Sequence, residues 1–284
     1  MSRKKERDRT EEGKGGTRGP ERAGRGGRLR RAAAVAAGLV LVAGLVAVAL
    51  LAWNPGAGGS PSGPKTAAIV DQLNLTAPNP DFVTAATKLL EKGGYSVDYY
   101  SGEDVTVDFY RSLPERDYDF VVLRAHSGLY RGIGPGGDGE SGDTLLALFT
   151  NEAYDQYKYF EDQDAGNIGK AFYREGGEEL FAIGQGFVAS SMRGRFDNTT
   201  IVMMGCDGLG STRTAEAFIA KGAKAFVSWS QQVSASFTDA ATERLLQKML
   251  IEGLSTSDAV EQTAAEVGAD PVYGAELRFL ESGD

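Results

Sequence analysis

The chain contains one cysteine, Cys206, and one histidine, His126. A cysteine attacks a carbonyl carbon as its thiolate, and a nearby imidazole lowers the thiol pKa and can protonate a leaving group. His126 follows the apolar run 120–125, and Cys206 follows the apolar run 201–204 and a glycine. Each run is short and bounded by glycine, which is typical of a buried parallel strand. If these strands are neighbours, the thiol and the imidazole meet at the rim where open α/β sheets place their reactive groups.

Thiolate attack creates an oxyanion, which needs backbone N–H donors nearby. Gly205, Gly208 and Gly128 leave room for a substrate carbonyl to approach the backbone. A helix expected to begin at Ser211 would add its N-terminal dipole. The residue types alone leave a second interpretation open, because a lone cysteine after an apolar strand is usually an inert buried residue. A lone histidine at a strand end is likewise often a satisfied or exposed side chain.

Strands and helices alternate on either side of these two runs. This order predicts an α/β fold with a mainly parallel sheet and helices on both faces. The helix 81–92 should bury one face containing Phe82, Ala85, Leu89 and Leu90. The expected strands are 66–72, 95–100, 118–125, 201–204, 223–229 and an edge strand at 276–280, and the other expected helices are 105–112, 211–221, 236–252 and 256–267.

The 79 residues between His126 and Cys206 have a weaker pattern. We expect a glycine-rich loop at 132–143, a strand at 144–150 and a surface helix at 154–160. Acidic residues of the loop, Asp138, Glu140 and Asp143, do not have the spacing of EF-hand calcium ligands. A solvated acidic loop is therefore the favoured interpretation, and no metal or organic cofactor is predicted.

The N-terminal residues differ in composition from the rest of the chain. Residues 1–31 hold twelve Lys/Arg against five Asp/Glu, which predicts a basic disordered tail and leaves an acidic body that argues against a nucleic-acid partner. The 22 residues 32–53 carry no charge, enough for a transmembrane helix whose basic flank stays cytoplasmic. A cleaved signal peptide is the alternative. A Gly/Pro/Ser linker at 54–65 then precedes an extracytoplasmic folded domain at 66–284.

Several short motifs together resemble one enzyme group. The apolar block ending at His126 and the later block ending at Gly205-Cys206 are similar to those of the clan CD cysteine peptidases, which include caspases, legumains, gingipains, separases and the bacterial CHAT-domain proteins. The sequence KGAKAFVSW at 221–229 resembles the strand motif G-A-x-A-V-x-x-x-W of the CHAT and gingipain group. Residues 238–264 resemble its paired helices, and 253–259 match a G-x-S-x-x-x-A turn.

This resemblance implies a caspase-like three-layer sandwich with Cys206 as nucleophile and His126 as general acid/base. It places oxyanion donors on the backbone around Gly205-Cys206 and just after the histidine. The family usually has glycine directly after this histidine, whereas here Ser127 precedes Gly128. It also implies that the strand edge formed by Ser228, Trp229 and Ser230 pairs with an extended peptide.

Two carboxylates could read the substrate. Asp71 ends the first strand and Asp207 follows the nucleophile, so either would meet a basic P1 side chain through a charge-assisted hydrogen bond. Alternatively, both are ordinary rim carboxylates, or Asp207 caps a turn.

The sequence therefore predicts a membrane-anchored cysteine endopeptidase of a prokaryote, acting on a peptide or protein substrate. The first alternative is an inactive caspase-like binding or sensing module at the cell surface. The second is an unrelated envelope protein with a doubly wound ligand-binding domain, in which the cysteine and histidine lie far apart.

Overall fold

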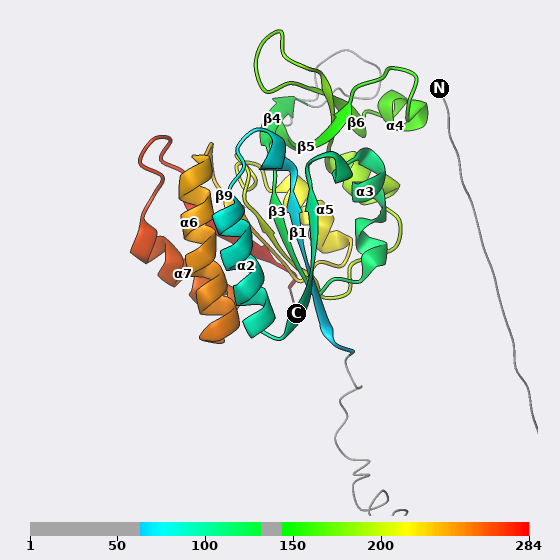
Figure 1. The fold of residues 1–284 in the computed structure, drawn as a ribbon. Helices are drawn as coiled ribbons and strands as arrows, with labels where there is room; N and C mark the ends of the chain where they lie inside the picture. The colour runs from blue at the N-terminus through cyan, green and yellow to red at the C-terminus, as the bar shows by residue number, and fades with distance from the viewer. Residues whose placement is uncertain (1–62, 132–143, 284) are drawn as a thin grey trace, which may run out of the picture. The chain divides into compact units, whose positions relative to one another are not determined.

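A mainly parallel six-stranded sheet forms the centre of the computed structural model, which describes residues 63–131 and 144–283 (Figure 1). The strand order is β10-β9-β8-β3-β1-β2, with only β10 running antiparallel to its neighbour. The α/β prediction is therefore confirmed at this level. The strands are β1 (Lys65–Asp71), β2 (Tyr95–Ser101), β3 (Phe120–Arg124), β8 (Thr200–Met203), β9 (Ala225–Trp229) and β10 (Leu277–Glu281).

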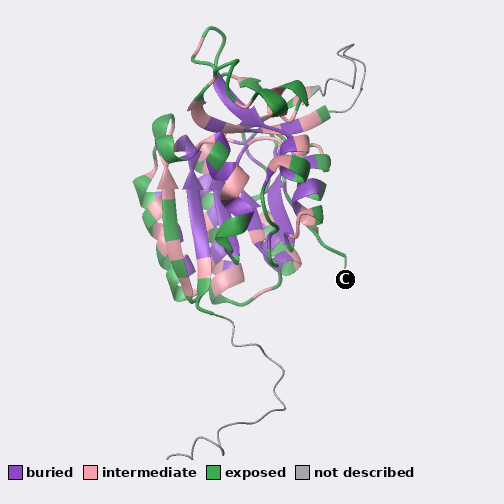
Figure 2. Ribbon diagram, turned by 90° about the vertical axis from the view of Figure 1, so that its right-hand side faces the viewer, coloured by how far each residue is buried: buried purple, intermediate pink, exposed green. Residues whose placement is uncertain are grey.

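Helices cover both faces of this sheet (Figure 1). One face carries α2 (Pro80–Lys92), α6 (Ala235–Leu246) and α7 (Thr256–Val267), and the other carries α3 (Val107–Ser112) and α5 (Arg213–Ala220). Alternate residues of a strand point to opposite faces, so Ile69 of β1 packs in the same core cluster as Phe82 of α2, whereas Val70 packs with the α3 side. The central strands are consequently buried throughout, as the purple strands of Figure 2 show.

A second, four-stranded antiparallel sheet is inserted between β3 and β8. Its strands are β4 (Ser127–Arg131), β5 (Thr144–Ala153), β6 (Ile168–Ala171) and β7 (Leu180–Ile183), in the order β4-β5-β7-β6. Leu146, Leu148 and Phe181 bury one face of this sheet in the main core, beside α3 and α5. The strand expected at 144–150 is confirmed and extends to Ala153, whereas the other three strands were not predicted.

Several expected details differ from the structure. No helix forms at 154–159, because this stretch turns, and the short helix α4 occupies Phe160–Asp164. The residue before α5 is Thr212 rather than Ser211, and its hydroxyl donates to Glu216 instead of capping the helix backbone. α6 ends at Leu246 and continues as one π-helical turn at Gln247–Ile251. In α2 the buried positions are Phe82, Ala86 and Leu90, so the buried stripe includes Ala86 and not Ala85.

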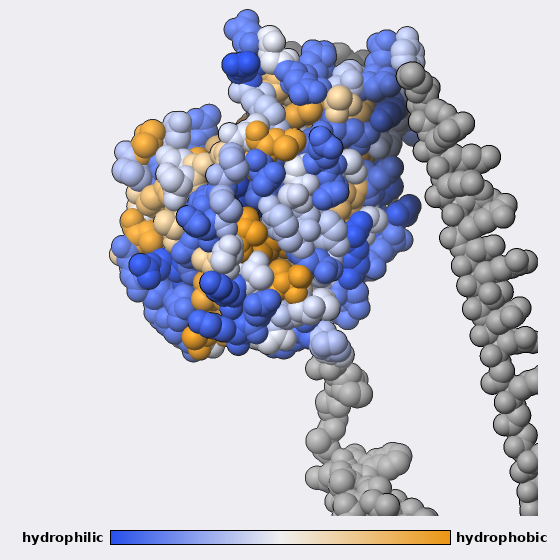
Figure 3. All heavy atoms as spheres, viewed as in Figure 1, coloured by the Kyte–Doolittle hydropathy of each residue, from blue (hydrophilic) through white to orange (hydrophobic). Residues whose placement is uncertain are grey.

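The predicted tail at 1–31, the transmembrane helix at 32–53, most of the linker and the loop 132–143 lie outside the described residues. Within 63–131 and 144–283, no helix has both the length and the apolar composition needed to cross a bilayer. On the face drawn in Figure 3, hydrophobic residues form small separate patches among hydrophilic ones.

Candidate active site

The strands that carry the two reactive residues are direct neighbours. β3 pairs in parallel with β8 from Phe120↔Thr200 to Leu123↔Met203, so the segments that follow both strands leave the sheet at the same rim. There the Ser127 hydroxyl donates a hydrogen bond to the carbonyl oxygen of Cys206 over 2.6 Å. A Cβ atom on Gly205 would collide with the Ala125 carbonyl and the Ser127 hydroxyl, so only glycine allows this close approach.

The Cys206 thiol lies against the backbone of Val233. The Val233 N–H donates to Sγ over 3.5 Å, and Sγ is 3.7 Å from the Val233 carbonyl oxygen. Burial raises the pKa of the Cys206 thiol, and the negative charges of Asp207 and Asp270 raise it further, while the Val233 N–H opposes them. In this conformation the resting group at neutral pH is therefore a thiol rather than a thiolate.

Asp207 lies beside the thiol in a turn. Its φ of 59° is left-handed, its N–H donates to the Gln231 carbonyl, and its carbonyl accepts from Gly210 N–H. The Asp207 carboxylate is half-buried, and burial raises its pKa. The turn alternative for Asp207 therefore describes its backbone, while the carboxylate lies close enough to Cys206 to influence the thiol.

Replacing Asp207 with asparagine is expected to lower the pKa of Cys206, because one of the negative charges that disfavour the thiolate is removed. The rate of Cys206 alkylation, measured against pH, should then rise at lower pH than in the wild type. Cys206 is the only thiol in the chain, so the label reports on this site alone. Asp197→Asn is the matched control, because Asp197 is exposed just before the opposite end of β8. A pH profile identical to the wild type in Asp207→Asn would contradict this electrostatic coupling.

His126 is held by a different set of neighbours. Its Nε2 atom lies 2.9 Å from the Thr76 hydroxyl, and its ring centroid is 4.6 Å from that of Tyr173. Burial lowers the pKa of His126 to about 4, with the positive charge of Arg124 acting in the same direction. The imidazole is therefore neutral at pH 7 and able to accept a proton.

The predicted backbone donors have different surroundings. Gly205 N–H faces the Met203 sulfur at 3.2 Å. Gly128 lies in β4 opposite Ala147, and a Cβ atom built on it would meet nothing within 4 Å. Within the part of the chain that the structure describes, no hydrogen bond joins the Cys206 thiol to the His126 ring. The arrangement thus brings both residues to one rim, with each side chain bonded to other partners.

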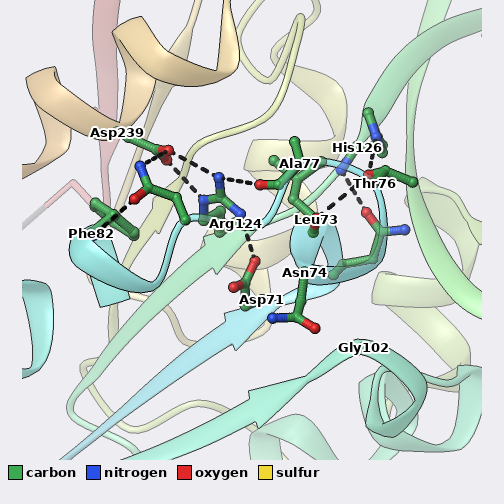
Figure 4. A network of polar contacts seen from close by, with 12 residues as sticks. Asp71, Leu73, Asn74, Thr76, Ala77, Phe82, Gly102, Arg124, His126 and Asp239 are labelled. Carbon is green, nitrogen blue, oxygen red and sulfur yellow. Dashed lines mark hydrogen bonds and ion pairs between the residues drawn. The ribbon is translucent and has the colours of Figure 1, made fainter. Parts of the chain in front are cut away.

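A buried ionic network lies next to the histidine (Figure 4). The Arg124 guanidinium bonds both carboxylate oxygens of Asp239, at 2.8 and 2.9 Å, and the Asp71 carboxylate at 2.8 Å. It also donates to the Ala77 carbonyl over 2.8 Å. The Asp71 side chain is completely buried. The prediction that Asp71 meets a substrate side chain is therefore wrong, because Arg124 of the neighbouring strand already neutralises it.

The strand edge at Ser228–Ser230 is also occupied. β10 pairs with β9 through Leu277↔Trp229 and Arg278↔Ser228, and Ser230 N–H donates to the Glu276 carbonyl. The predicted peptide-binding edge is therefore wrong, since the C-terminal strand covers it. The side chains are engaged as well: the Ser228 hydroxyl donates to the Met203 carbonyl over 2.7 Å, and Trp229 Nε1 donates to Thr238 over 2.8 Å.

Three residues near His126 were not predicted: Gln72, Thr76 and Tyr173. Gln72 and Thr76 follow β1, the neighbour of β3, so the rule that placed His126 at the rim would have identified this segment too. Tyr173 follows β6 and carries no such sequence signal.

Among the described residues, no group of three or more His, Cys, Asp or Glu side chains is arranged to hold a metal ion. No protein-family model matches the chain, and a comparison with curated proteins gives no match.

Proposed function

We propose that the domain is a caspase-like cysteine endopeptidase that cleaves peptide bonds through Cys206 and His126. The observation that carries this proposal is the placement of the only cysteine and the only histidine after two adjacent parallel strands, at one rim of the sheet. The hydrogen bond from Ser127 to the Cys206 carbonyl supports it, because it ties the residue after the histidine to the nucleophile. Helices on both faces and a mainly parallel sheet agree with the three-layer sandwich that the family resemblance implies.

In the proposed reaction, Cys206 Sγ forms a bond to the carbonyl carbon of the substrate, and the thiol proton passes to His126. His126 then gives this proton to the leaving amine as the C–N bond breaks. A water molecule attacks the resulting thioester, and its proton returns through His126 to the sulfur. The N–H of Cys206, with a backbone N–H from the segment after the histidine, would stabilise the oxyanion.

The charge states of the two groups agree with this order of events. The Cys206 pKa is raised, so the thiol keeps its proton until attack, and the His126 imidazole is neutral and can receive it. Since the thiol now faces Val233 and the imidazole faces Thr76, the proposal requires both side chains to reorient when substrate binds.

Asp207 is the proposed contact for a basic P1 side chain. Its half-buried carboxylate lies beside the nucleophile, and in the described residues it takes part in no side-chain hydrogen bond or ion pair. An ammonium or guanidinium group would find an acceptor there.

We infer in addition that the domain is anchored to a membrane through residues 32–53, with residues 1–31 in the cytoplasm. The uncharged stretch flanked by Arg28, Arg30 and Arg31 supports this arrangement.

Incubation of the full-length chain with a fluorogenic peptide library tests the proposed function. We expect hydrolysis, enriched for peptides with Lys or Arg before the scissile bond. Prior alkylation at alkaline pH should abolish hydrolysis, because Cys206 is the only thiol present. No turnover by the unmodified chain at any pH between 5 and 9 would refute an active peptidase.

An inactive binding module is the second candidate, favoured by the contact between the thiol and Val233 and by the raised thiol pKa. It predicts that an extended peptide binds with the same affinity before and after alkylation and is recovered intact.

A further inference from the structure

Gln72 is the polar residue that joins the two sheets beside His126. It follows β1 directly and begins the 3₁₀ helix Gln72–Leu75. Its side chain has no exposed surface. A fully buried amide is expensive to leave unpaired, so the partners of both its ends are informative.

The two ends of the Gln72 amide bind different parts of the molecule. Oε1 accepts the backbone N–H of His126 over 2.8 Å. Nε2 points to the second sheet, where the Asn151 amide oxygen lies at 2.6 Å and the Thr150 carbonyl oxygen at 3.2 Å. One side chain therefore fixes the backbone of the histidine to strand β5.

The same network reaches the imidazole ring through Tyr173. The Tyr173 hydroxyl lies 2.6 Å from Gln72 Nε2 and donates to Asn151 over 2.9 Å. Its ring packs on the His126 ring, with 4.6 Å between centroids. The His126 backbone and one side of its ring are thus both held by groups that bond to Gln72.

Asn151 is presented to this network by an irregularity in β5. The pairing of β5 with β7 shifts register between Phe149 and Ala153, and such bulges redirect side chains. The Asn151 amide N–H groups donate to the carbonyl oxygens of Gln72 and Gly102, each over 2.8 Å. The segments after β1, after β2 and in β5 therefore converge on one amide.

We propose that Gln72 is a positioning residue for His126, which it holds against the second sheet together with Asn151 and Tyr173. This inference rests on the proposed function for its meaning in catalysis. Since the network touches the histidine and not the thiol, its loss should reduce kcat while KM changes little. A displacement of about 1 Å at a reacting group costs on the order of 10²-fold in rate.

The test combines kinetics with NMR of the full-length chain, prepared without a polyhistidine tag. His126 is the only histidine, so selective labelling gives a single imidazole signal. Gln72→Met keeps the volume and removes both hydrogen-bonding ends. We expect the His126 pKa to rise from about 4 towards the ordinary value of about 6.5, because the released ring regains water. Arg124 and the Tyr173 hydroxyl, the other polar groups facing the ring, remain in this variant.

Thr199→Val is the matched control for a purely structural loss. Thr199 is 1% exposed and donates to the Tyr118 carbonyl over 2.6 Å, just before the opposite end of β8. It should lower stability while leaving the His126 signal and kcat unchanged. A folded Gln72→Met chain with wild-type His126 pKa and kcat would overturn the proposal.

If Gln72→Met does not fold, Tyr173→Leu provides the same reading, because Tyr173 is 38% exposed and its replacement leaves the core intact. A raised His126 pKa in this variant supports the proposal, and an unchanged one overturns it. If the wild type hydrolyses no peptide, the proposed function fails, and the NMR comparison alone decides whether Gln72 positions the ring.

Discussion

Peptide hydrolysis is expected to fall by about 10²–10⁴-fold when His126 is replaced by alanine, the range typical of a lost general acid/base. Without the imidazole, no group takes the thiol proton or protonates the leaving amine. The remaining rate should rise with pH, since only the thiolate fraction can then react. Measurement of kcat/KM from pH 4 to 9 with the best library substrate would show this change.

Imidazole added to the assay provides the control for folding. It should partly restore hydrolysis by His126→Ala, since the deletion leaves space between Thr76 and Tyr173. Cys206→Ala should hydrolyse no peptide, with or without imidazole. The wild-type rate should fall only as the pH drops through about 4, where the histidine gains its proton. Equal rates for wild type and His126→Ala would contradict the assigned role.

Replacement of Arg124 by methionine is expected to lower the free energy of unfolding by about 3–5 kcal/mol, the cost of breaking a buried ion pair by removing one partner. The Arg124 side chain is 1% exposed and lies between the 0% exposed carboxylate of Asp71 and the 5% exposed carboxylate of Asp239. Without the guanidinium, both carboxylates are buried with no cation beside them. Urea unfolding monitored by tryptophan fluorescence would measure the difference.

Two comparisons make this prediction specific. Adding Asp71→Asn and Asp239→Asn to Arg124→Met should recover part of the lost stability, because the buried charges are then gone. Arg278→Met is the matched surface control, since Arg278 pairs with Glu276 where both side chains are more than half exposed, and we expect little change. A loss in Arg124→Met no greater than in Arg278→Met would show that the buried network does not stabilise the fold.

The sequence predicts the central sheet well for a physical reason. Strands β1, β3, β8 and β9 are buried on both faces, so each appears as an apolar run with glycine or polar residues at its ends. β4 and β6 are short and only partly buried, with sequences such as IGKA at Ile168–Ala171, and carry no comparable signal. The second sheet therefore escapes an analysis based on hydrophobic periodicity.

The site shows the same division. Adjacent strands place His126 and Cys206 at one rim, which strand order alone allows one to predict. The misassignment of Asp71 arises because its partners come from other elements: Arg124 lies on β3, and Asp239 belongs to α6, far along the chain. Likewise, nothing before Leu277 indicates that the C-terminal strand returns to cover the edge at Trp229.

The insertion of a whole sheet between β3 and β8 has a consequence for protein synthesis. The 79 residues between His126 and Cys206 must all be translated before the second half of the site exists. At about 5–20 residues per second this takes roughly 4–16 s. During that interval the second sheet has both its outer strands available to pair, while β3 lacks its neighbour β8. A growing chain therefore carries the histidine side of the site for seconds without a nucleophile beside it, and it gains the capacity to cut peptides only when the domain is almost complete.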